Sequence, residues 1–491
     1  MQICASIIEE SAEKALADLL EIRLDYLEKP DLETLLTDPP RPVIVTNRCR
    51  AEGGEFKGSE TDRLAILEKA LEYEPAMMDL ELSVGEGVLK KFTRKKGGTR
   101  LIVSFHDFNG APPFSVLEER LKQIKAARGD VAKIVTRVES VEDLLRIKSL
   151  LDKAAEIDQP LAAFGMGPLG RFSRVLAPTW GSVLSYAALG EGKEAAPGQM
   201  TGFEMRRLFK KGVDPAALHG QSELYGVLGS PVGHSLSPVI HNAAFRHLDL
   251  DCFYVPVDIE DADLAFNCVR ALHFQGLSVT LPHKLSIMEE MDEIESSAET
   301  LGAVNTVTLL EGKYIGGNTD WLGLLKALEE HTTLRGKSVL LAGAGGAARA
   351  AAYGLTKAGA RVTVTNRTRE KGKQLASEFG TGFRPPEELK PAGADILVNA
   401  TPLGMIALKD QTPFPADLLE SRMIVMDMVY APSETRLLRE ARQAGCRVVG
   451  GLSMLLNQAA VQFETWTALP APLDIMRTAA EKALEEEHDL S

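Results

Sequence analysis

One lysine of the chain lies among apolar residues in a run that is typical of a buried strand. The run is VAKIVTRV (131–138), and the lysine is Lys133. Burial favours the neutral amine, which can attack a ketone and form an imine. His106, in SFHDF (104–108), could take the proton beside that imine, because an imidazole has an ordinary pKa of about 6.5. The pair predicts imine chemistry; the alternative is a lysine that extends outward along the strand to solvent.

A second lysine and an aspartate lie at two predicted junctions between strands and helices. Lys284 ends the strand-like run GLSVTLPHK (276–284), and Asp320 follows a hairpin-like pair of strands within 302–323. An ammonium and a carboxylate that meet at such junctions could transfer a proton to or from a carbonyl oxygen. The alternative for Asp320 is that it caps the helix that begins there.

The run LLAGAGGAARAA (340–351) places the pattern G-x-G-x-x-A between a strand and a helix of a βαβ unit. In dinucleotide-binding domains the first glycine permits a tight turn and the second lets the backbone approach a pyrophosphate. Ala348 would allow close helix packing, and the helix N-terminus would face the phosphates. The turn residues expected to contact the cofactor are Gly343, Ala344, Gly345, Gly346 and Ala347.

The next strand ends without the acidic residue that would bind the ribose of NAD. Asn366, Arg367 and Thr368 stand there instead. A cation with amide and hydroxyl neighbours suits a 2′-phosphate, so the pattern predicts NADP as the cofactor. We expect no metal site, because the cysteines are scattered and form no CxxC pair.

The N-terminal part of the sequence alternates strand-like and helix-like segments, which predicts an α/β fold with a (β/α)8 barrel. The strand-like segments are 2–7, 20–27, 42–48, 76–82, 100–108, 131–138, 160–167 and 182–189, and a helix over 202–212 would close the barrel. Chemistry in such barrels lies at the carboxyl ends of the strands. The polar residues in or just after these strands are Glu21, Arg23, Asp25, Arg48, His106, Asp107, Lys133 and Arg174. For each one alone, the alternative is a solvated charge or a capped strand end.

The C-terminal part begins after a linker-like stretch over 212–222. A turn-rich loop carries Ser235 and Ser237 before Pro238, and capping of the following helix explains these serines as well as binding does. Runs at 396–405 and 423–430 would continue a parallel sheet, and a helix over 450–467 would return to the first lobe. We therefore predict a barrel over 1–215, a substrate lobe over 223–330 completed by 456–491, and a Rossmann lobe over 331–455.

Composition excludes several classes of partner. The formal net charge is −14, which argues against nucleic acid and anionic membranes. The five cysteines are odd in number and favour a reducing compartment. No targeting segment or run of transmembrane length is recognisable, so the expected location is the cytoplasm.

The motifs EIRLDYL, NRCRAEGGE, SFHDF, AKIV and APGQ together resemble the type I 3-dehydroquinate dehydratase family over about 1–215. The resemblance implies that Lys133 forms an imine with the ring ketone of 3-dehydroquinate and that His106, oriented by Glu52, is the general acid/base. The further residues that it implies in substrate binding are Glu21, Arg23, Arg48, Met166, Arg174 and Gln199. Arg174 would bind the carboxylate. Ala195 stands where many members have serine, which removes a hydroxyl contact.

Residues 223–485 resemble shikimate dehydrogenase. The resemblance implies that Lys284 and Asp320 form the acid/base pair. The implied substrate-binding residues are Ser235, Ser237, Thr280, Asn305, Tyr430 and Gln458, and those bordering the nicotinamide are Asn399, Thr401 and Gly451. Two positions depart from the family pattern: Trp321 replaces a common glycine and could reshape the mouth of the site, and Ser278 replaces a frequent asparagine.

Both resemblances together imply a bifunctional enzyme that dehydrates 3-dehydroquinate and then reduces 3-dehydroshikimate with NADPH. Its partners would be these small anionic molecules. One alternative is that the C-terminal part acts on quinate with NAD, although Arg367 disfavours NAD. Another is that the barrel is a non-catalytic binding module, although the joint presence of Lys133, His106, Glu52 and Arg174 argues against lost activity.

Overall fold

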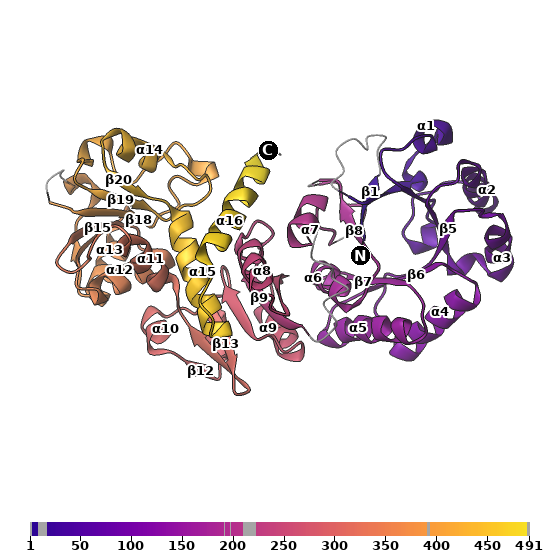
Figure 1. Cartoon of the computed structure of the whole chain (residues 1–491), viewed down its shortest axis with the longest axis horizontal. Coiled ribbons are helices and arrows are strands. Elements are labelled where there is room, and N and C mark those ends of the chain that lie inside the picture. Colours follow the sequence, from indigo (N-terminus) through magenta and orange to yellow (C-terminus); the bar gives the residue numbers. More distant parts are fainter. Residues whose placement is uncertain are drawn as a thin grey trace. The chain divides into compact units, whose positions relative to one another are not determined.

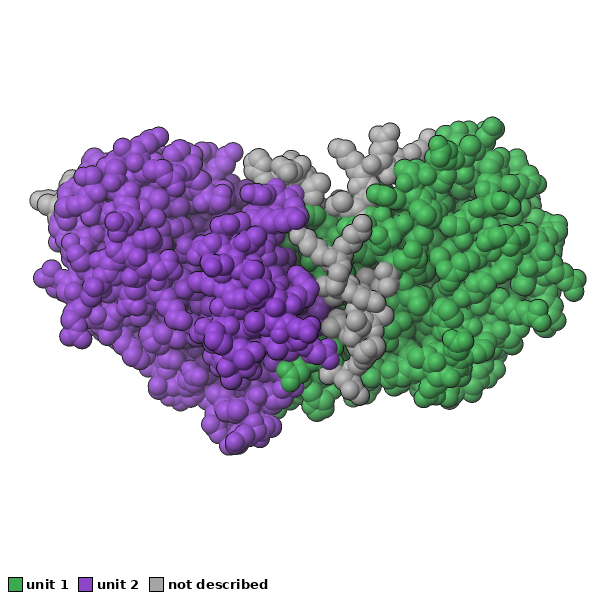
Figure 2. Space-filling model, viewed as in Figure 1, with its two compact units in different colours: residues 1–224, 229–235, 255–273 green, residues 225–228, 236–254, 274–491 purple. Residues whose placement is uncertain are grey.

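The computed structural model describes residues 2–7, 17–190, 192–196, 198–209, 222–389 and 393–488. The chain forms two compact units, which Figure 2 shows in green (1–224, 229–235, 255–273) and purple (225–228, 236–254, 274–491). The predicted linker, apart from Ser222, and the last three residues of the predicted closing helix lie outside the described residues. The predicted boundaries at 215 and 223 therefore stay predictions.

The N-terminal part is a barrel of parallel strands, which confirms the predicted fold class (Figure 1). The strands are β1 (Gln2–Ile7), β2 (Leu19–Arg23), β3 (Val43–Thr46), β4 (Met77–Glu81), β5 (Arg100–Asp107), β6 (Val131–Arg137), β7 (Leu161–Met166) and β8 (Leu184–Ala188). They are hydrogen-bonded in the order β7-β6-β5-β4-β3-β2-β1-β8. The amide of Val183, just before β8, donates to the carbonyl of Leu161 on β7 at 2.9 Å, which brings the two ends of the sheet together.

Helices cover the outside of the barrel. They are α1 (Leu32–Leu36), α2 (Glu60–Ala70), α3 (Glu86–Lys95), α4 (Phe114–Ala126), α5 (Val141–Glu156), α6 (Gly170–Leu176) and α7 (Gly202–Leu208). In α5, Ser140 and Asp143 form a capping box, and Leu144, Ile147 and Leu151 are buried on one face. The onset of α7 at Gly202 agrees with the closing helix that the sequence predicts over 202–212.

The C-terminal part begins with a six-stranded mixed sheet in the order β10-β9-β11-β13-β14-β12. Its strands are β9 (Glu223–Gly229), β10 (Cys252–Asp258), β11 (Gly276–Val279), β12 (Glu293–Ile294), β13 (Thr306–Leu310) and β14 (Lys313–Gly317). The accompanying helices are α8 (Ser237–His247), α9 (Ala262–Ala271) and α10 (Ser296–Leu301). The N-cap of α8 is Leu236, so Ser237 is already helical and the capping alternative for Ser237 is wrong.

A second six-stranded sheet follows, and all its strands are parallel. They are β15 (Ser338–Ala342), β16 (Arg361–Thr365), β17 (Gly382–Phe383), β18 (Ile396–Asn399), β19 (Ile424–Asp427) and β20 (Arg447–Val449), with helices α12 (Gly346–Lys357), α13 (Arg369–Glu378) and α14 (Arg436–Gln443). The order β17-β16-β15-β18-β19-β20 reverses direction between β15 and β18. Ligands of doubly wound sheets bind at this switch point, beyond the carboxyl ends of the strands.

Three further helices belong to the same part: α11 (Asp320–Glu329), α15 (Gly451–Thr467) and α16 (Leu473–His488). Helix α15 packs on α11, α8 and β13, which confirms that the predicted C-terminal helix returns to the first lobe. Helices α11 and α15 approach each other closely at Gly323 of α11. A Cβ atom there would lie 2.7–2.8 Å from atoms of Gln458 and Met454 on α15. No helix in the described part of the chain has both the length and the apolar character that a membrane crossing requires.

Two neighbouring glycines should respond differently to alanine. Gly343 has a φ of 124°, and a Cβ there would lie 2.7 Å from the carbonyl oxygen of Ala400. Gly343→Ala should therefore destabilise the chain by about 1–3 kcal/mol. Gly345 has a φ of −93°, and its Cβ would meet no atom within 4 Å, so Gly345→Ala is the matched control. Thermal and urea unfolding of both variants measure this difference, and equal losses of stability would contradict it.

Candidate active sites

One layer of the barrel interior carries charged and aromatic side chains from alternate strands. Glu21 lies on β2, Asp79 on β4, Lys133 on β6 and Tyr186 on β8. Alternate strands supply the four side chains of one layer in this fold, usually apolar ones. Here the layer brings two carboxylates and an amine together inside the barrel.

Lys133 points into this layer and is 5% exposed, so the outward-facing alternative is wrong. Its Nζ lies 3.1 Å from Oδ2 of Asp79 and 3.6 Å from Oε1 of Glu21. The same nitrogen lies 4.0 Å from the centroid of the Tyr186 ring. The amine is therefore fixed near the barrel axis by two carboxylates and a cation–π contact.

Arg48 connects the carboxylates of this region. Its Nη2 lies 2.7 Å from Oδ2 of Asp79, and its Nη1 donates to the Ser104 hydroxyl at 2.6 Å and lies 3.3 Å from Glu81. Burial alone would raise the pKa of Asp79, but Arg48 and Lys133 outweigh it and hold that pKa far below its usual range. Both terminal nitrogens of Arg48 thus have protein partners, in addition to any contact that they make with a substrate.

His106 and Glu52 form a hydrogen-bonded pair at the edge of the same cavity. The Nδ1 atom of His106 lies 3.0 Å from Oε2 of Glu52, which also accepts the backbone amide of His106. The Ser83 hydroxyl donates to the other oxygen at 2.8 Å. Burial raises the pKa of Glu52 to about 7. Burial, and then the cations Arg48 and Lys133, lower the pKa of His106 well below its usual value, which keeps the imidazole neutral and able to accept a proton.

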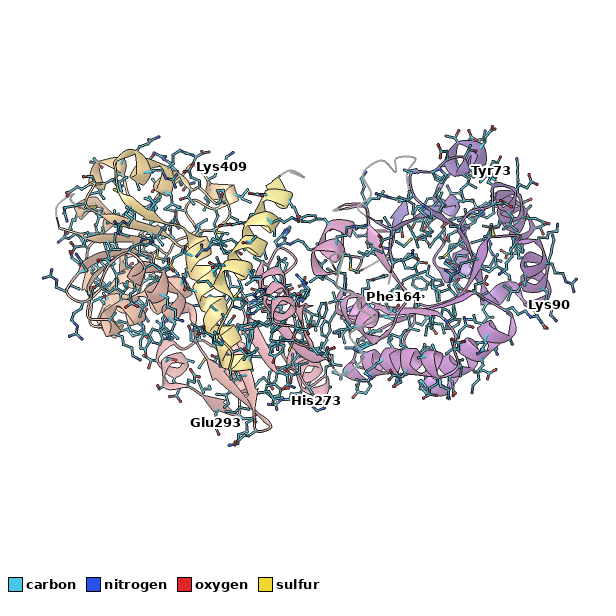
Figure 3. All side chains as sticks on the ribbon, in the orientation of Figure 1. Tyr73, Lys90, Phe164, His273, Glu293 and Lys409 are labelled. Atoms are coloured by element: carbon cyan, nitrogen blue, oxygen red, sulfur yellow. The ribbon has the colours of Figure 1, made fainter. Side chains whose placement is uncertain are left out.

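Arg174 offers a buried guanidinium to the cavity. The residue is 1% exposed, and its Nε and Nη1 atoms have no hydrogen-bond partner among the described residues. Burial lowers its pKa to about 10. The guanidinium lies 4.3 Å from the centroid of the Phe164 ring, which Figure 3 labels. Buried donors without partners suit a carboxylate ligand, which a guanidinium binds with paired hydrogen bonds.

The nine barrel residues that the dehydratase resemblance implies line one cavity of about 260 Å³, whereas Asp25 and Asp107 do not line it. The nine are Glu21, Arg23, Arg48, Glu52, His106, Lys133, Met166, Arg174 and Gln199. Arg23 is paired with Asp25, and the Gln199 side chain accepts the backbone amide of Ala195. A larger groove of about 450 Å³ shares only Glu52 with this cavity, so the chemistry of the lining rather than the volume identifies the candidate site.

The C-terminal part contains the predicted ion pair. Nζ of Lys284 lies 2.6 Å from Oδ2 of Asp320, and the amide of Asn305 donates to the other carboxylate oxygen at 2.7 Å. Helix α11 has no side-chain cap, so capping does not explain Asp320. The pair is partly buried, which leaves the ammonium within reach of a ligand.

A hydrogen-bond network surrounds this pair. Thr319 contacts Oε1 of Gln458 at 3.4 Å and accepts from Asn305 at 3.2 Å. Gln462, which the sequence analysis did not name, donates to Thr306 and accepts from the Ser278 hydroxyl at 2.7 Å. Ser278, one of the two unusual positions, therefore connects α15 to β11.

For the other predicted substrate-binding residues, the structure gives the position in the fold. Ser237 begins α8, Thr280 follows β11, and Tyr430 lies three residues after β19. Ser235 precedes Ser237 by two residues and belongs to the first compact unit. Their binding roles stay predictions.

Trp321 packs against α12. Its ring meets Tyr353 edge-on at 5.4 Å, and Nζ of Lys357 lies 4.8 Å from its centroid. The tryptophan therefore joins α11 to α12 by aromatic and cation–π contacts.

The glycine-rich turn fits a dinucleotide phosphate. Helix α12 begins at Gly346, and Gly345 is its N-cap without a side-chain hydrogen bond. Cβ atoms added to Gly345 and Gly346 would meet nothing within 4 Å, so the backbone there is open to a ligand. Gly345, Gly346 and Ala347 are exposed, as is Ala344 in part, whereas Ala348 is buried as the motif requires. Backbone amides at a helix N-terminus bind phosphate well.

The residues expected at a 2′-phosphate lie at the end of β16. Arg367 and Thr368 are exposed, and the amide of Asn366 donates to the carbonyl of Thr368 at 2.8 Å. The turn is thus ordered by Asn366, while the Arg367 guanidinium is accessible to an anion.

Asn399 and Gly451 contribute to the local structure, in addition to their predicted role at the nicotinamide. The Asn399 side chain accepts from the amide and hydroxyl of Thr401 and donates to Asp427 at 2.9 Å. A Cβ on Gly451 would lie 2.5 Å from the carbonyl oxygen of Met428. Asp427 could not be singled out from the sequence, because an acidic residue at a strand end has no distinctive spacing.

Models of two enzyme families match the chain. The type I 3-dehydroquinase model matches residues 4–211, and the shikimate dehydrogenase substrate binding domain matches 227–307. The shikimate/quinate 5-dehydrogenase model matches 326–417, and the shikimate 5′-dehydrogenase C-terminal domain matches 451–481.

Known proteins resemble either one part of the chain or nearly all of it. A shikimate dehydrogenase (NADP(+)) of Pyrococcus abyssi is 44% identical over 52% of this chain and 96% of its own length. A crystal structure of shikimate dehydrogenase in complex with NADP+ aligns with a TM-score of 0.52 and 38% identity, covering 54% of this chain and 97% of that chain. The chloroplastic bifunctional 3-dehydroquinate dehydratase/shikimate dehydrogenase of Arabidopsis thaliana is 33% identical over 96% of this chain and 83% of its own length. The chain therefore belongs to the family of bifunctional 3-dehydroquinate dehydratase/shikimate dehydrogenases.

Proposed function

We propose that the chain dehydrates 3-dehydroquinate through an imine on Lys133 and reduces the resulting 3-dehydroshikimate to shikimate with NADPH. The observation that carries the proposal is the cavity lined by Lys133, the His106–Glu52 pair and Arg174, two of whose guanidinium nitrogens have no hydrogen-bond partner among the described residues. A non-catalytic barrel would have no need for this combination of amine, base and anion site.

In the first reaction, Arg174 binds the substrate carboxylate and Lys133 attacks the ring ketone. The new C–N bond forms as the carbonyl oxygen leaves as water, which gives an imine that withdraws electrons from the adjacent C–H bond. His106 removes that proton, and Glu52 stabilises the charge that develops on the imidazole. His106 then returns the proton to the neighbouring hydroxyl group, which leaves as water. Hydrolysis of the imine releases the product and restores the amine of Lys133.

In the second reaction, the Lys284 ammonium donates a proton to the carbonyl oxygen that becomes the alcohol. Asp320 holds the ammonium in place at 2.6 Å, and Asn305 fixes the carboxylate. Bound NADPH supplies the hydride to the carbonyl carbon. The turn at Gly343–Ala347 would hold the pyrophosphate, and Arg367 with Asn366 and Thr368 would hold the 2′-phosphate. Ser237, Thr280 and Gln458 would bind the substrate.

We propose the division into domains that the sequence predicts: a dehydratase over 1–215, a substrate lobe over 223–330 with 456–491, and a cofactor lobe over 331–455. The family models support it, because their matches change between 211 and 227.

We also propose a reducing compartment such as the cytoplasm. All five cysteines are free thiols, which supports it. The name of the Arabidopsis relative specifies the chloroplast for that protein, so fractionation of the native host is the deciding measurement.

Lys133→Ala should abolish dehydration and leave reduction of 3-dehydroshikimate intact, because the nucleophile is lost from the barrel only. Borohydride added with 3-dehydroquinate should attach the ligand mass to the Lys133 peptide of the unmodified chain, as peptide mass spectrometry would show. Lys148→Ala, at a lysine in a surface ion pair with Asp152, is the control. A label on another lysine would overturn the proposed imine.

The dehydration rate should rise with pH through about 7, because the pKa of Glu52 lies near that value. Below it, Glu52 is protonated and cannot stabilise a positive charge on His106; above it, the carboxylate can. Glu52→Gln should lower the rate and remove this inflection, while the exposed Glu55→Gln keeps it. The profile of the initial rate against pH is the measurement, and an unchanged inflection in Glu52→Gln would assign it to another group.

Arg367→Ala should raise the KM for NADPH by roughly 10- to 150-fold, the equivalent of about 1.5–3 kcal/mol for a charged hydrogen bond. The KM for NADH should change little, because NADH lacks the 2′-phosphate. Arg361→Ala, at the opposite end of β16, is the matched control. Turnover of shikimate and of quinate with both cofactors tests the alternative substrate in the same series. Equal effects on NADPH and NADH would contradict the role of Arg367.

A further inference from the structure

Tyr186 carries a buried hydroxyl for which the reaction described above has no use. The residue lies on β8 and is 3% exposed, and its Oη atom has no hydrogen-bond partner among the described residues. A buried hydroxyl without a partner costs free energy, so native proteins rarely keep one without a reason. Burial, and next the carboxylate of Glu21, raise the pKa of Tyr186 well above its usual value, so the group stays a neutral donor.

The hydroxyl belongs to the side-chain layer that holds the reactive amine. The Tyr186 ring lines the same cavity as Lys133 and lies 4.0 Å from its Nζ. The ring also packs against Phe164, with 5.7 Å between centroids, and Arg174 lies over Phe164. The amine therefore lies over one ring and the guanidinium over the other, and the two rings are in contact. A ligand that contacted both cations would lie close to these rings.

Most of the other polar groups in the layer of the amine are already committed to protein partners. Asp79, held ionised, is an acceptor only. The hydroxyls of Ser6 and Thr46 already donate to Glu21, and the Ser104 hydroxyl donates to Asp79. Both terminal nitrogens of Arg48 are engaged with protein groups. The Tyr186 hydroxyl is the neutral donor of this layer whose hydrogen is uncommitted among the described residues.

We propose that the Tyr186 hydroxyl donates a hydrogen bond to the substrate oxygen on the carbon that Lys133 attacks. This inference rests on the proposed function. As the N–C bond forms, the electron pair of the carbonyl bond moves to that oxygen, which gains a proton from the attacking amine to give the carbinolamine. The C–O bond then breaks as the C=N bond of the imine forms, and the oxygen leaves as water after it takes the second proton of the amine nitrogen. Tyr186 keeps its own proton and stabilises the negative charge on the oxygen during attack.

The test is Tyr186→Phe in the full chain, because this change removes one oxygen and keeps the ring. Imine formation is followed by rapid mixing with 3-dehydroquinate, borohydride quenching and quantification of labelled Lys133 peptide by mass spectrometry. The rate should fall roughly 10- to 100-fold, as expected for loss of one donor to a developing oxyanion. The melting temperature should stay equal or rise, since the oxygen has no protein partner to lose. Reduction of 3-dehydroshikimate should not change.

Ser185→Ala is the matched control. Ser185 is the preceding residue of β8, is 1% exposed and also has an unpartnered hydroxyl, but it does not line the cavity. This variant should form the imine at the unmodified rate. An unchanged rate in Tyr186→Phe would overturn the inference and leave the proposed function standing. A slower rate that comes with a lowered melting temperature would also overturn it, because the hydroxyl would then be structural. Absence of any label in the unmodified chain would refute the proposed function together with this inference.

Discussion

The dehydratase half depends on a cluster of charges buried inside the barrel. Two carboxylates, Glu21 and Asp79, share the interior with the ammonium of Lys133 and the guanidinium of Arg48. Such charges are expensive to bury unless each one is paired and hydrogen-bonded. Asp79 meets that condition for both cations, at 3.1 Å from Lys133 and 2.7 Å from Arg48. The cluster makes this barrel layer polar, whereas the corresponding layers of most barrels are apolar. In return it holds the amine of Lys133 in one place.

The same constraint explains the contrast between Lys133 and Arg174. Lys133 has protein partners within its own layer, whereas two nitrogens of the buried Arg174 have no hydrogen-bond partner in the part of the chain that the structure describes. A buried cation with nitrogens that lack protein partners is stabilised when an anion binds to it. The cavity therefore contains both a buried guanidinium that lacks partners among the described residues and an amine that has them. In the dehydrogenase half the charges are partly exposed, and the Lys284–Asp320 pair is held by Asn305 and the surrounding network.

Much of this arrangement could be predicted from the sequence. The eight barrel strands were recognisable from the alternation of apolar runs and helical segments, and residues at their carboxyl ends share one cavity. The direction of Lys133 could not be predicted, because a single lysine in a strand fits either face. Asp79 escaped notice for a related reason: it lies 54 residues from Lys133 in MMDLE, and only closure of the barrel brings the two together. Tyr186 could not be told from an ordinary core aromatic in the sequence, because only the structure shows that its hydroxyl has no hydrogen-bond partner among the described residues. Asp320 and Ser237 allowed a capping interpretation that only the helix starts could reject.

In this enzyme family two sites work in series, and the product of the barrel is the substrate of the dehydrogenase. The most direct test gives the purified chain 3-dehydroquinate and NADPH, without added 3-dehydroshikimate, and follows cofactor fluorescence and products by chromatography. We expect NADPH to be consumed and one shikimate to form for each NADPH oxidised. If NADPH stays unchanged with 3-dehydroquinate while added 3-dehydroshikimate is reduced, the barrel is not a dehydratase, which would contradict the proposed function.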